Sequence, residues 1–132
     1  MALVKCLHPN HPPLLALRGL GWLASKIKWL SVDNPKEIYQ NNQTSIVFKH
    51  SPRCIISRIV LKKFEYDYSP SSKIDNFYLV NVIIERQISN EISHLYNLNH
   101  ESPQVLLVKS NKLLFDASHS EIKFKDLINV NC

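Results

Sequence analysis

The chain has 132 residues, enough for one domain, and an apolar fraction of 45% allows a packed core. The net charge of +5 comes from Lys and Arg spread along the chain, without an Arg-rich run or interleaved aromatic residues, so nucleic acid is not expected as a partner. The two glycines, Gly19 and Gly21, exclude Walker loops, dinucleotide fingerprints and the Gly-x-Ser-x-Gly elbow.

The first 25 residues differ in pattern from the rest. Their apolar run, Leu14 to Ala24, has about eleven residues against the roughly 18 that a membrane span needs, and it contains Arg18. We therefore expect a loosely ordered N-terminal extension over residues 1–25, a domain over residues 26–132, and no membrane span. Three cysteines without a Cys-x-x-Cys pair, and six scattered histidines, favour a reducing, cytoplasmic location and no metal site.

The first part of the domain alternates between the apolar period of a strand and that of a helix. Asp33 or Asn34 can cap the first helix, and Ser51 the second, with Pro52 in its first turn. Strands joined by helices in this way are expected to be parallel. In chain order we predict a strand over 27–32, a helix over 35–41, a strand over 45–49, a helix between Ser51 and the loop at 67–75, a strand over 77–84, and a helix over 88–98 with Ser89 as a possible cap.

The last part of the domain predicts a β-hairpin and a closing helix. Strands over Gln104–Lys109 and Lys112–Asp116 flank Ser110-Asn111, which fits a two-residue turn. A helix over Glu121–Asn129 ends the chain. The sequence therefore predicts an α/β fold: a central mixed sheet of four to five strands, helices on both faces, and a C-terminal hairpin and helix.

Cys54 directly follows the second predicted strand and stands at the start of a helix. The thiolate is the nucleophilic form of cysteine, and the free N–H groups and dipole of a helix N-terminus stabilise it. Arg53, Arg58 and His50 can add positive potential, and Ser57, one turn later, can donate a hydrogen bond to the sulfur. The alternative is that Cys54 is a small buried residue, the commoner fate of a lone cysteine.

Pro103 is the second feature of interest. It follows a predicted helix and stands just ahead of a strand. In this topology it would face the first turn of the helix that begins at Cys54. The alternative is an ordinary trans proline in a surface turn.

Together these residues resemble the monothiol bacilliredoxins of the YtxJ type, thioredoxin-like proteins linked to the low-molecular-weight thiol bacillithiol. The resemblance spans about residues 28–128. Ile55 stands where the family usually has proline directly after the cysteine. The matching stretches are Phe48-Lys49-His50-Ser51-Pro52-Arg53-Cys54-Ile55-Ile56-Ser57, Val60-Leu61-Lys62-Lys63-Phe64-Glu65 and Glu101-Ser102-Pro103-Gln104-Val105-Leu106.

The resemblance implies a thioredoxin-like fold and a monothiol thiol-disulfide oxidoreductase, a disulfide reductase that removes bacillithiol from mixed disulfides on client proteins. Cys54 would be the nucleophile, and Ser57, in the place of a resolving cysteine, would hydrogen-bond its thiolate. Pro103 would be a cis-proline close to Cys54. No cofactor would stay bound, and bacillithiol would be the co-substrate. The residues expected to bind substrate are His50, Arg53, Arg58 and Ser102.

Two other functions remain open. One is a glutaredoxin-like or thioredoxin-like reductase that uses another thiol, because no residue directly reads the identity of the thiol. The other is a thioredoxin-like interaction module without catalysis, in which Cys54 is merely buried.

Overall fold

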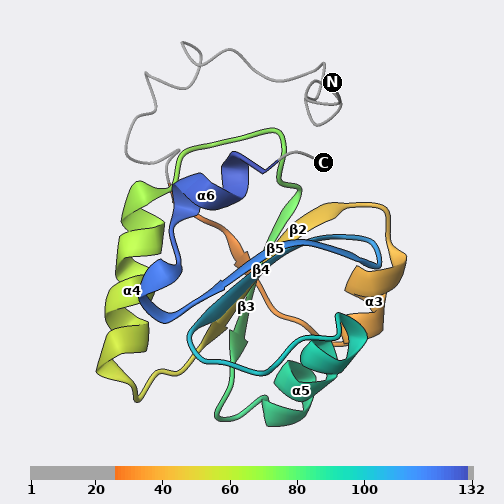
Figure 1. The fold of residues 1–132 in the computed structure, drawn as a ribbon, viewed down its shortest axis with the longest axis horizontal. Coiled ribbons are helices and arrows are strands. Elements are labelled where there is room, and N and C mark those ends of the chain that lie inside the picture. The colour runs from red at the N-terminus through yellow and green to blue at the C-terminus, as the bar shows by residue number, and fades with distance from the viewer. Residues whose placement is uncertain (1–25, 131–132) are drawn as a thin grey trace.

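A five-stranded sheet runs through the middle of the molecule (Figure 1). The computed structural model describes residues 26–130, so the extension expected over residues 1–25 lies outside the described residues. The strand order is β1-β3-β2-β4-β5. The strands are β1 (Trp29–Leu30), β2 (Thr44–His50), β3 (Asn76–Asn81), β4 (Gln104–Lys109) and β5 (Lys112–Ser118).

The directions of the strands confirm the predicted mixed sheet. β1, β3 and β2 are parallel, β4 runs antiparallel to β2, and β5 runs antiparallel to β4. β4 and the hairpin turn fall at the predicted residues. The antiparallel pair therefore lies at one edge, as expected for an α/β fold that ends in a hairpin.

Helices cover both faces of this sheet, with α4 on the left and α3 and α5 on the right of Figure 1. The single closing helix expected over residues 121–129 is instead a 3₁₀ turn followed by a short α-helix. The helices are α3 (Pro35–Gln40), α4 (Ile55–Asp67), α5 (Arg86–Leu95), the 3₁₀ helix η2 (His119–Glu121) and α6 (Phe124–Ile128). Over residues 26–130, no helix has the length and apolar character that a membrane span needs.

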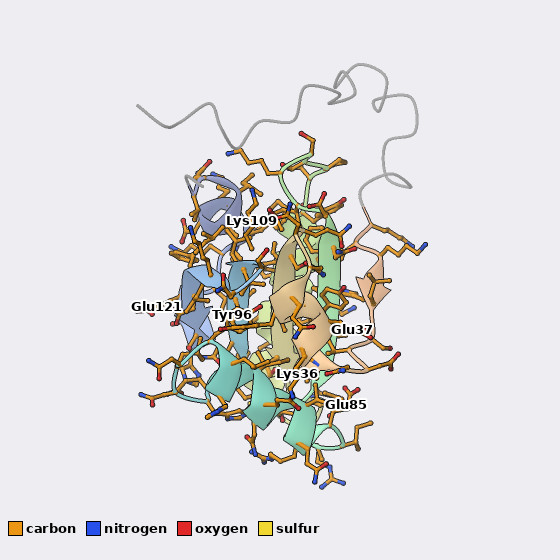
Figure 2. All side chains as sticks on the ribbon, turned by 90° about the vertical axis from the view of Figure 1, so that its right-hand side faces the viewer. Lys36, Glu37, Glu85, Tyr96, Lys109 and Glu121 are labelled. Atoms are coloured by element: carbon orange, nitrogen blue, oxygen red, sulfur yellow. The ribbon has the colours of Figure 1, made fainter. Side chains whose placement is uncertain are left out.

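The alternation along β2 divides the core into two layers. Ile46 and Phe48 face α4 and α6, where Phe48 packs edge-on against Phe64 with ring centroids 5.3 Å apart. Val47 faces the other way and packs with Ile92 of α5. Figure 2 looks onto that second face, where Lys36 marks α3 and Tyr96 marks the end of α5.

α4 begins later than the sequence predicts, and this places the cysteine. Ser51 does not cap the helix, and Pro52 lies in a turn that Cys54 closes by donating its N–H to the Ser51 carbonyl at 3.1 Å. Cys54 itself is the N-cap residue, and Ile55 is the first residue of the helix. The Ser51 N–H donates to the Ser57 hydroxyl at 3.0 Å, and this hydrogen bond orders the turn before the helix.

β3 and α5 also differ from their predicted limits. β3 ends at Asn81 because the Asn81 side chain accepts hydrogen bonds from the N–H groups of Ile83 and Ile84 and turns the chain. α5 then starts after Glu85, its N-cap residue. Ser89, the predicted cap, is instead buried within the helix.

Candidate active site

The predicted site residues lie at one edge of the sheet in the strand direction, where β2 ends. β2 ends there at His50, and the chain reaches Cys54 four residues later. β4 runs antiparallel and begins at the same edge, where Gln104 lies opposite Lys49. Pro103, one residue before Gln104, is therefore level with His50 and at the same edge as Cys54.

Cys54 is partly buried at the N-terminus of α4. Its carbonyl accepts the N–H of Arg58 at 3.0 Å, which closes the first turn of the helix. Within residues 26–130 it is a free thiol, outside any disulfide. The first N–H groups of a helix have no partner within the helix, and the helix dipole favours an anion there. Cys54 thus stands where the sequence places it, at the start of a helix.

Ser57 has other partners than the expected one. Its side chain is fully buried, its Oγ accepts the N–H of Ser51 at 3.0 Å, and it lies 2.8 Å from His50 Nδ1. In the described part of the chain no hydrogen bond joins it to Cys54. Its hydroxyl is occupied because the buried turn needs an acceptor for the Ser51 N–H. In this structure Ser57 therefore holds the loop that leads to the cysteine.

His50 carries less positive charge than the sequence suggests. Burial, as the main cause, and the charge of Arg58 lower its pKa, while the Glu65 carboxylate opposes them in part. The ring is therefore neutral at neutral pH. Because the Ser57 oxygen already accepts the Ser51 N–H, Nδ1 of the neutral ring can accept the Ser57 O–H.

Arg53 and Arg58 supply the positive charge at the site. Both side chains are exposed, Arg53 directly before Cys54 and Arg58 one helical turn after it. The effect of Arg58 on the pKa of His50 shows that its charge is felt at the end of β2. Two solvated cations therefore lie close to Cys54 along the chain, one before it and one after it.

The loop before β4 is held in a defined shape. The Ser102–Pro103 peptide bond is cis, as predicted, and Pro103 is buried. The Gln104 side chain donates to the Asn99 carbonyl at 3.0 Å and so ties the loop to the strand. Among residues 26–130, the buried Ser102 hydroxyl makes no hydrogen bond.

Sequence reasoning missed Lys49. Its side chain is fully buried, and Nζ donates to the Ser89 carbonyl at 2.9 Å and to the Ser93 hydroxyl at 2.5 Å. Burial lowers the pKa of Lys49 to about 8. The available signal was a lysine between Phe48 and His50 in an otherwise apolar strand, where a charge has to find partners inside the protein.

The solved structures that the chain resembles share the thioredoxin fold. A proposed oxidoreductase with a thioredoxin fold is 28% identical, matches 80% of this chain and 93% of its own, and has a TM-score of 0.61. Thioredoxin from Malassezia sympodialis (14% identity, 92% and 93% coverage, TM-score 0.60) and the short form of spinach chloroplast thioredoxin f (12%, 80% and 89%, 0.56) agree in fold. These likenesses confirm the expected thioredoxin-like architecture.

The family is shown by a match over most of the domain. Residues 28–127 match the model of the monothiol bacilliredoxin BrxC family. The matched segment includes Cys54, the helix that it caps and the loop at Pro103. The chain therefore belongs to the monothiol bacilliredoxin BrxC family and is a thiol oxidoreductase with a thioredoxin fold.

Proposed function

We propose that the protein removes bacillithiol from mixed disulfides on client proteins, with Cys54 as the nucleophile. The observation that supports this most is the position of Cys54 at the N-terminus of α4, with exposed Arg53 directly before it and exposed Arg58 one helical turn after it. The family match gives the chemical class, and the dipole at the N-terminus of a helix favours an anion in general.

In the first step, the Cys54 thiolate attacks the bacillithiol sulfur of the mixed disulfide. A bond forms between Cys54 Sγ and that sulfur, and the bond between bacillithiol and the client breaks. The client leaves as a thiolate and takes a proton from water. The client cysteine is reduced, and Cys54 now carries bacillithiol.

In the second step, a free bacillithiol thiolate attacks the bacillithiol sulfur on Cys54. This releases bacillithiol disulfide and regenerates the Cys54 thiolate. A second thiol molecule is needed because Ser57 occupies the position, three residues after Cys54, from which a resolving cysteine could act. Bacillithiol is thus a co-substrate, and no bound cofactor takes part.

The neighbouring residues have proposed roles in binding. Bacillithiol carries a malate group, and Arg53 and Arg58 provide exposed cations for its carboxylates. The buried Ser102 hydroxyl has an unused hydrogen-bonding capacity at the loop before β4. Pro103 has no N–H and leaves the backbone before it open to pair with an extended client segment. The reducing conditions that this cycle needs fit the cytoplasm.

The test is incubation of the reduced protein with a bacillithiol mixed disulfide and, separately, with a glutathione mixed disulfide, followed by intact-mass measurement. We expect a bacillithiol adduct that forms on the wild type and is absent from Cys54→Ser. A faster reaction with the glutathione disulfide would instead support a glutaredoxin-like reductase. An equal adduct on Cys54→Ser would move the chemistry to another cysteine and contradict the proposal.

A further inference from the structure

The outer face of α4 exposes large apolar side chains that the other described residues, within 26–130, leave unpacked. Ile55 is 63% exposed, Ile59 60% and Tyr66 89%. They recur at helical spacing along the side of α4 that faces away from the sheet, the left-hand side of Figure 1. Contiguous exposed apolar residues on a folded domain mark an interaction surface more often than single ones do.

These side chains line an open, shallow surface formed by α4 alone, with a volume of about 520 Å³, which we call the groove. The groove begins at Ile55, the residue next to Cys54, and ends at Tyr66. At 1.5 Å per residue this is about 16 Å, the length of about five residues of extended chain. A segment in the groove would therefore have one end beside the thiol.

The charge of the groove is positive. Its polar lining residues are Arg58, Lys62 and Lys63, and of these Lys63 is paired with Asp67 at 3.3 Å. Within residues 26–130, Arg58 and Lys62 form no salt bridge. The groove thus combines an apolar floor with two unneutralised cations.

We propose that the outer groove of α4 binds an acidic segment of the client protein that also carries apolar side chains, next to the modified cysteine. The inference rests on the proposed function, since it names the client's part in the same reaction. Acidic residues complement Lys62, the groove cation that bacillithiol does not use, and apolar side chains cover Ile59 and Tyr66.

A second copy of this chain fits the groove less well. A two-fold symmetric contact places the same patch on both partners. Lys62 and Arg58 of one copy would therefore lie close to Lys62 and Arg58 of the other copy. The like charges would repel each other across the apolar floor.

The test uses two synthetic peptides, each with one cysteine in a mixed disulfide with bacillithiol. In one the six neighbouring residues alternate Glu and Leu, and in the other Lys and Leu; versions with the cysteine at the opposite end cover both chain directions. We expect kcat/KM for the Glu peptide to be about tenfold higher than for the Lys peptide, a preference that salt reduces. Equal values for the two peptides would overturn the proposal.

Matched variants assign this preference to the groove. Lys62→Glu should lower kcat/KM for the Glu peptide about fivefold or more and raise it for the Lys peptide. Ile59→Ser should lower kcat/KM for both peptides. Lys36→Glu makes the same charge change on α3, on the other face of the sheet (Figure 2), and should change neither. Equal losses in Lys36→Glu and Lys62→Glu would contradict a local site.

Failure of the groove and failure of the proposed reaction can be told apart. The mixed disulfide of bacillithiol with 2-mercaptoethanol has no peptide to dock. The Lys62→Glu protein should therefore convert this disulfide to thiols at a rate within about twofold of the wild-type rate. If the wild type does not reduce it, the proposed reaction fails, and the groove is tested by fluorescence anisotropy with a labelled, cysteine-free Glu peptide. If Lys62→Glu weakens binding of this peptide, the result supports the groove. If the peptide does not bind to the wild type, the proposal is overturned.

A wild-type dimer that Ile59→Asp dissociates in sedimentation would assign the groove to a second copy and overturn the proposal.

Discussion

At the scale of single residues, the Ser57 hydroxyl joins the end of β2 to the turn that precedes Cys54. It accepts the Ser51 N–H at 3.0 Å and lies 2.8 Å from His50 Nδ1, in a fully buried position. Buried polar groups cost free energy when they lose their partners, whereas an intact network fixes one geometry. The orientation of the turn before the thiol therefore depends on one hydroxyl.

Removing this hydroxyl should destabilise the protein. We expect Ser57→Ala to lower the free energy of unfolding by about 1–3 kcal/mol, because the Ser51 N–H and the His50 ring lose a shared partner. Urea denaturation at pH 7 measures the loss. Ser69→Ala, in an exposed loop, should stay within about 0.5 kcal/mol of the wild type. An equally small change in Ser57→Ala would mean that water replaces the hydroxyl.

The neutral His50 ring should make the stability depend on pH. Its pKa is lower in the folded protein than in the unfolded chain, so the unfolded chain binds more protons as the pH falls below about 6.5. Stability should therefore be fully present above pH 6.5 and decrease toward pH 5. His50→Asn should make this decrease smaller.

The measurement for His50 is the urea midpoint at pH 7 and at pH 5. His100 also has a lowered pKa, mainly from burial, so His50→Asn should remove only part of the decrease. His94→Asn, at an exposed position of α5, should leave it unchanged. A decrease of wild-type size in His50→Asn would show that protonation of His50 costs the fold nothing.

At the scale of secondary structure, the start of α4 has the geometry that a proline requires. Ile55 is the first residue of the helix, where the backbone N–H has no partner within the helix and proline is favoured. Cys54, before it, has φ of −93° and ψ of 122°, the extended conformation that suits a residue before proline. The isoleucine side chain is 63% exposed, so little packing depends on it.

Ile55→Pro should therefore stabilise the protein by about 0.4–1 kcal/mol, because proline restricts the unfolded chain without straining the helix. The thermal midpoint should rise, and an adduct should still form at Cys54. As a control, Ile59→Pro lies one turn further into α4 and should cost about 3 kcal/mol. A fall in the midpoint for Ile55→Pro would mean that the Ile55 N–H has a structural role.

The sequence predicted the order and type of these elements better than their ends. Asn34 caps α3 as expected, since its side chain accepts the Lys36 N–H at 3.1 Å. The predicted end of β3 and the predicted starts of α4 and α5 were wrong. Polar side chains, which the apolar pattern does not include, decide where these elements end and begin. Asn81 stops β3 by binding backbone N–H groups, and Ser57 orders the turn before α4 from within the helix.

The candidate site shows the same division. The places of Cys54 and Pro103 follow from local rules: a residue between a buried strand and a helix, and a proline before the next strand. The partners of Ser57 and the burial of Lys49 depend on how β2 packs against two different helices. Spacing along the chain carries no information on those contacts.

At the scale of the whole molecule, buried polar groups join α5 to the sheet beneath the site. Lys49 extends from β2 to Ser89 and Ser93 on α5, and the Ser89 hydroxyl lies 2.9 Å from His100 Nε2. His100 belongs to the loop that leads to Pro103, and the charge of Lys49 contributes to the lowering of its pKa. One buried polar cluster thus joins β2, which precedes Cys54, to α5 and to the loop before β4.

The charge of Lys49 should give the whole fold a stability that rises with pH under alkaline conditions. The pKa is about 8 in the folded protein and 10.5 in the ordinary, exposed state, so between these values the unfolded chain holds the proton more often than the folded protein does. The free energy of unfolding of the wild type should therefore increase as the pH rises from about 7.5 to about 9.5.

Lys49→Met, which keeps the length of the side chain and removes the charge, should reduce this increase, whereas Lys36→Met at an exposed position of α3 should not. Urea midpoints at several pH values across this range measure the slope for all three proteins. A slope in Lys49→Met equal to that of the wild type would show that Lys49 is not the group whose titration changes the stability.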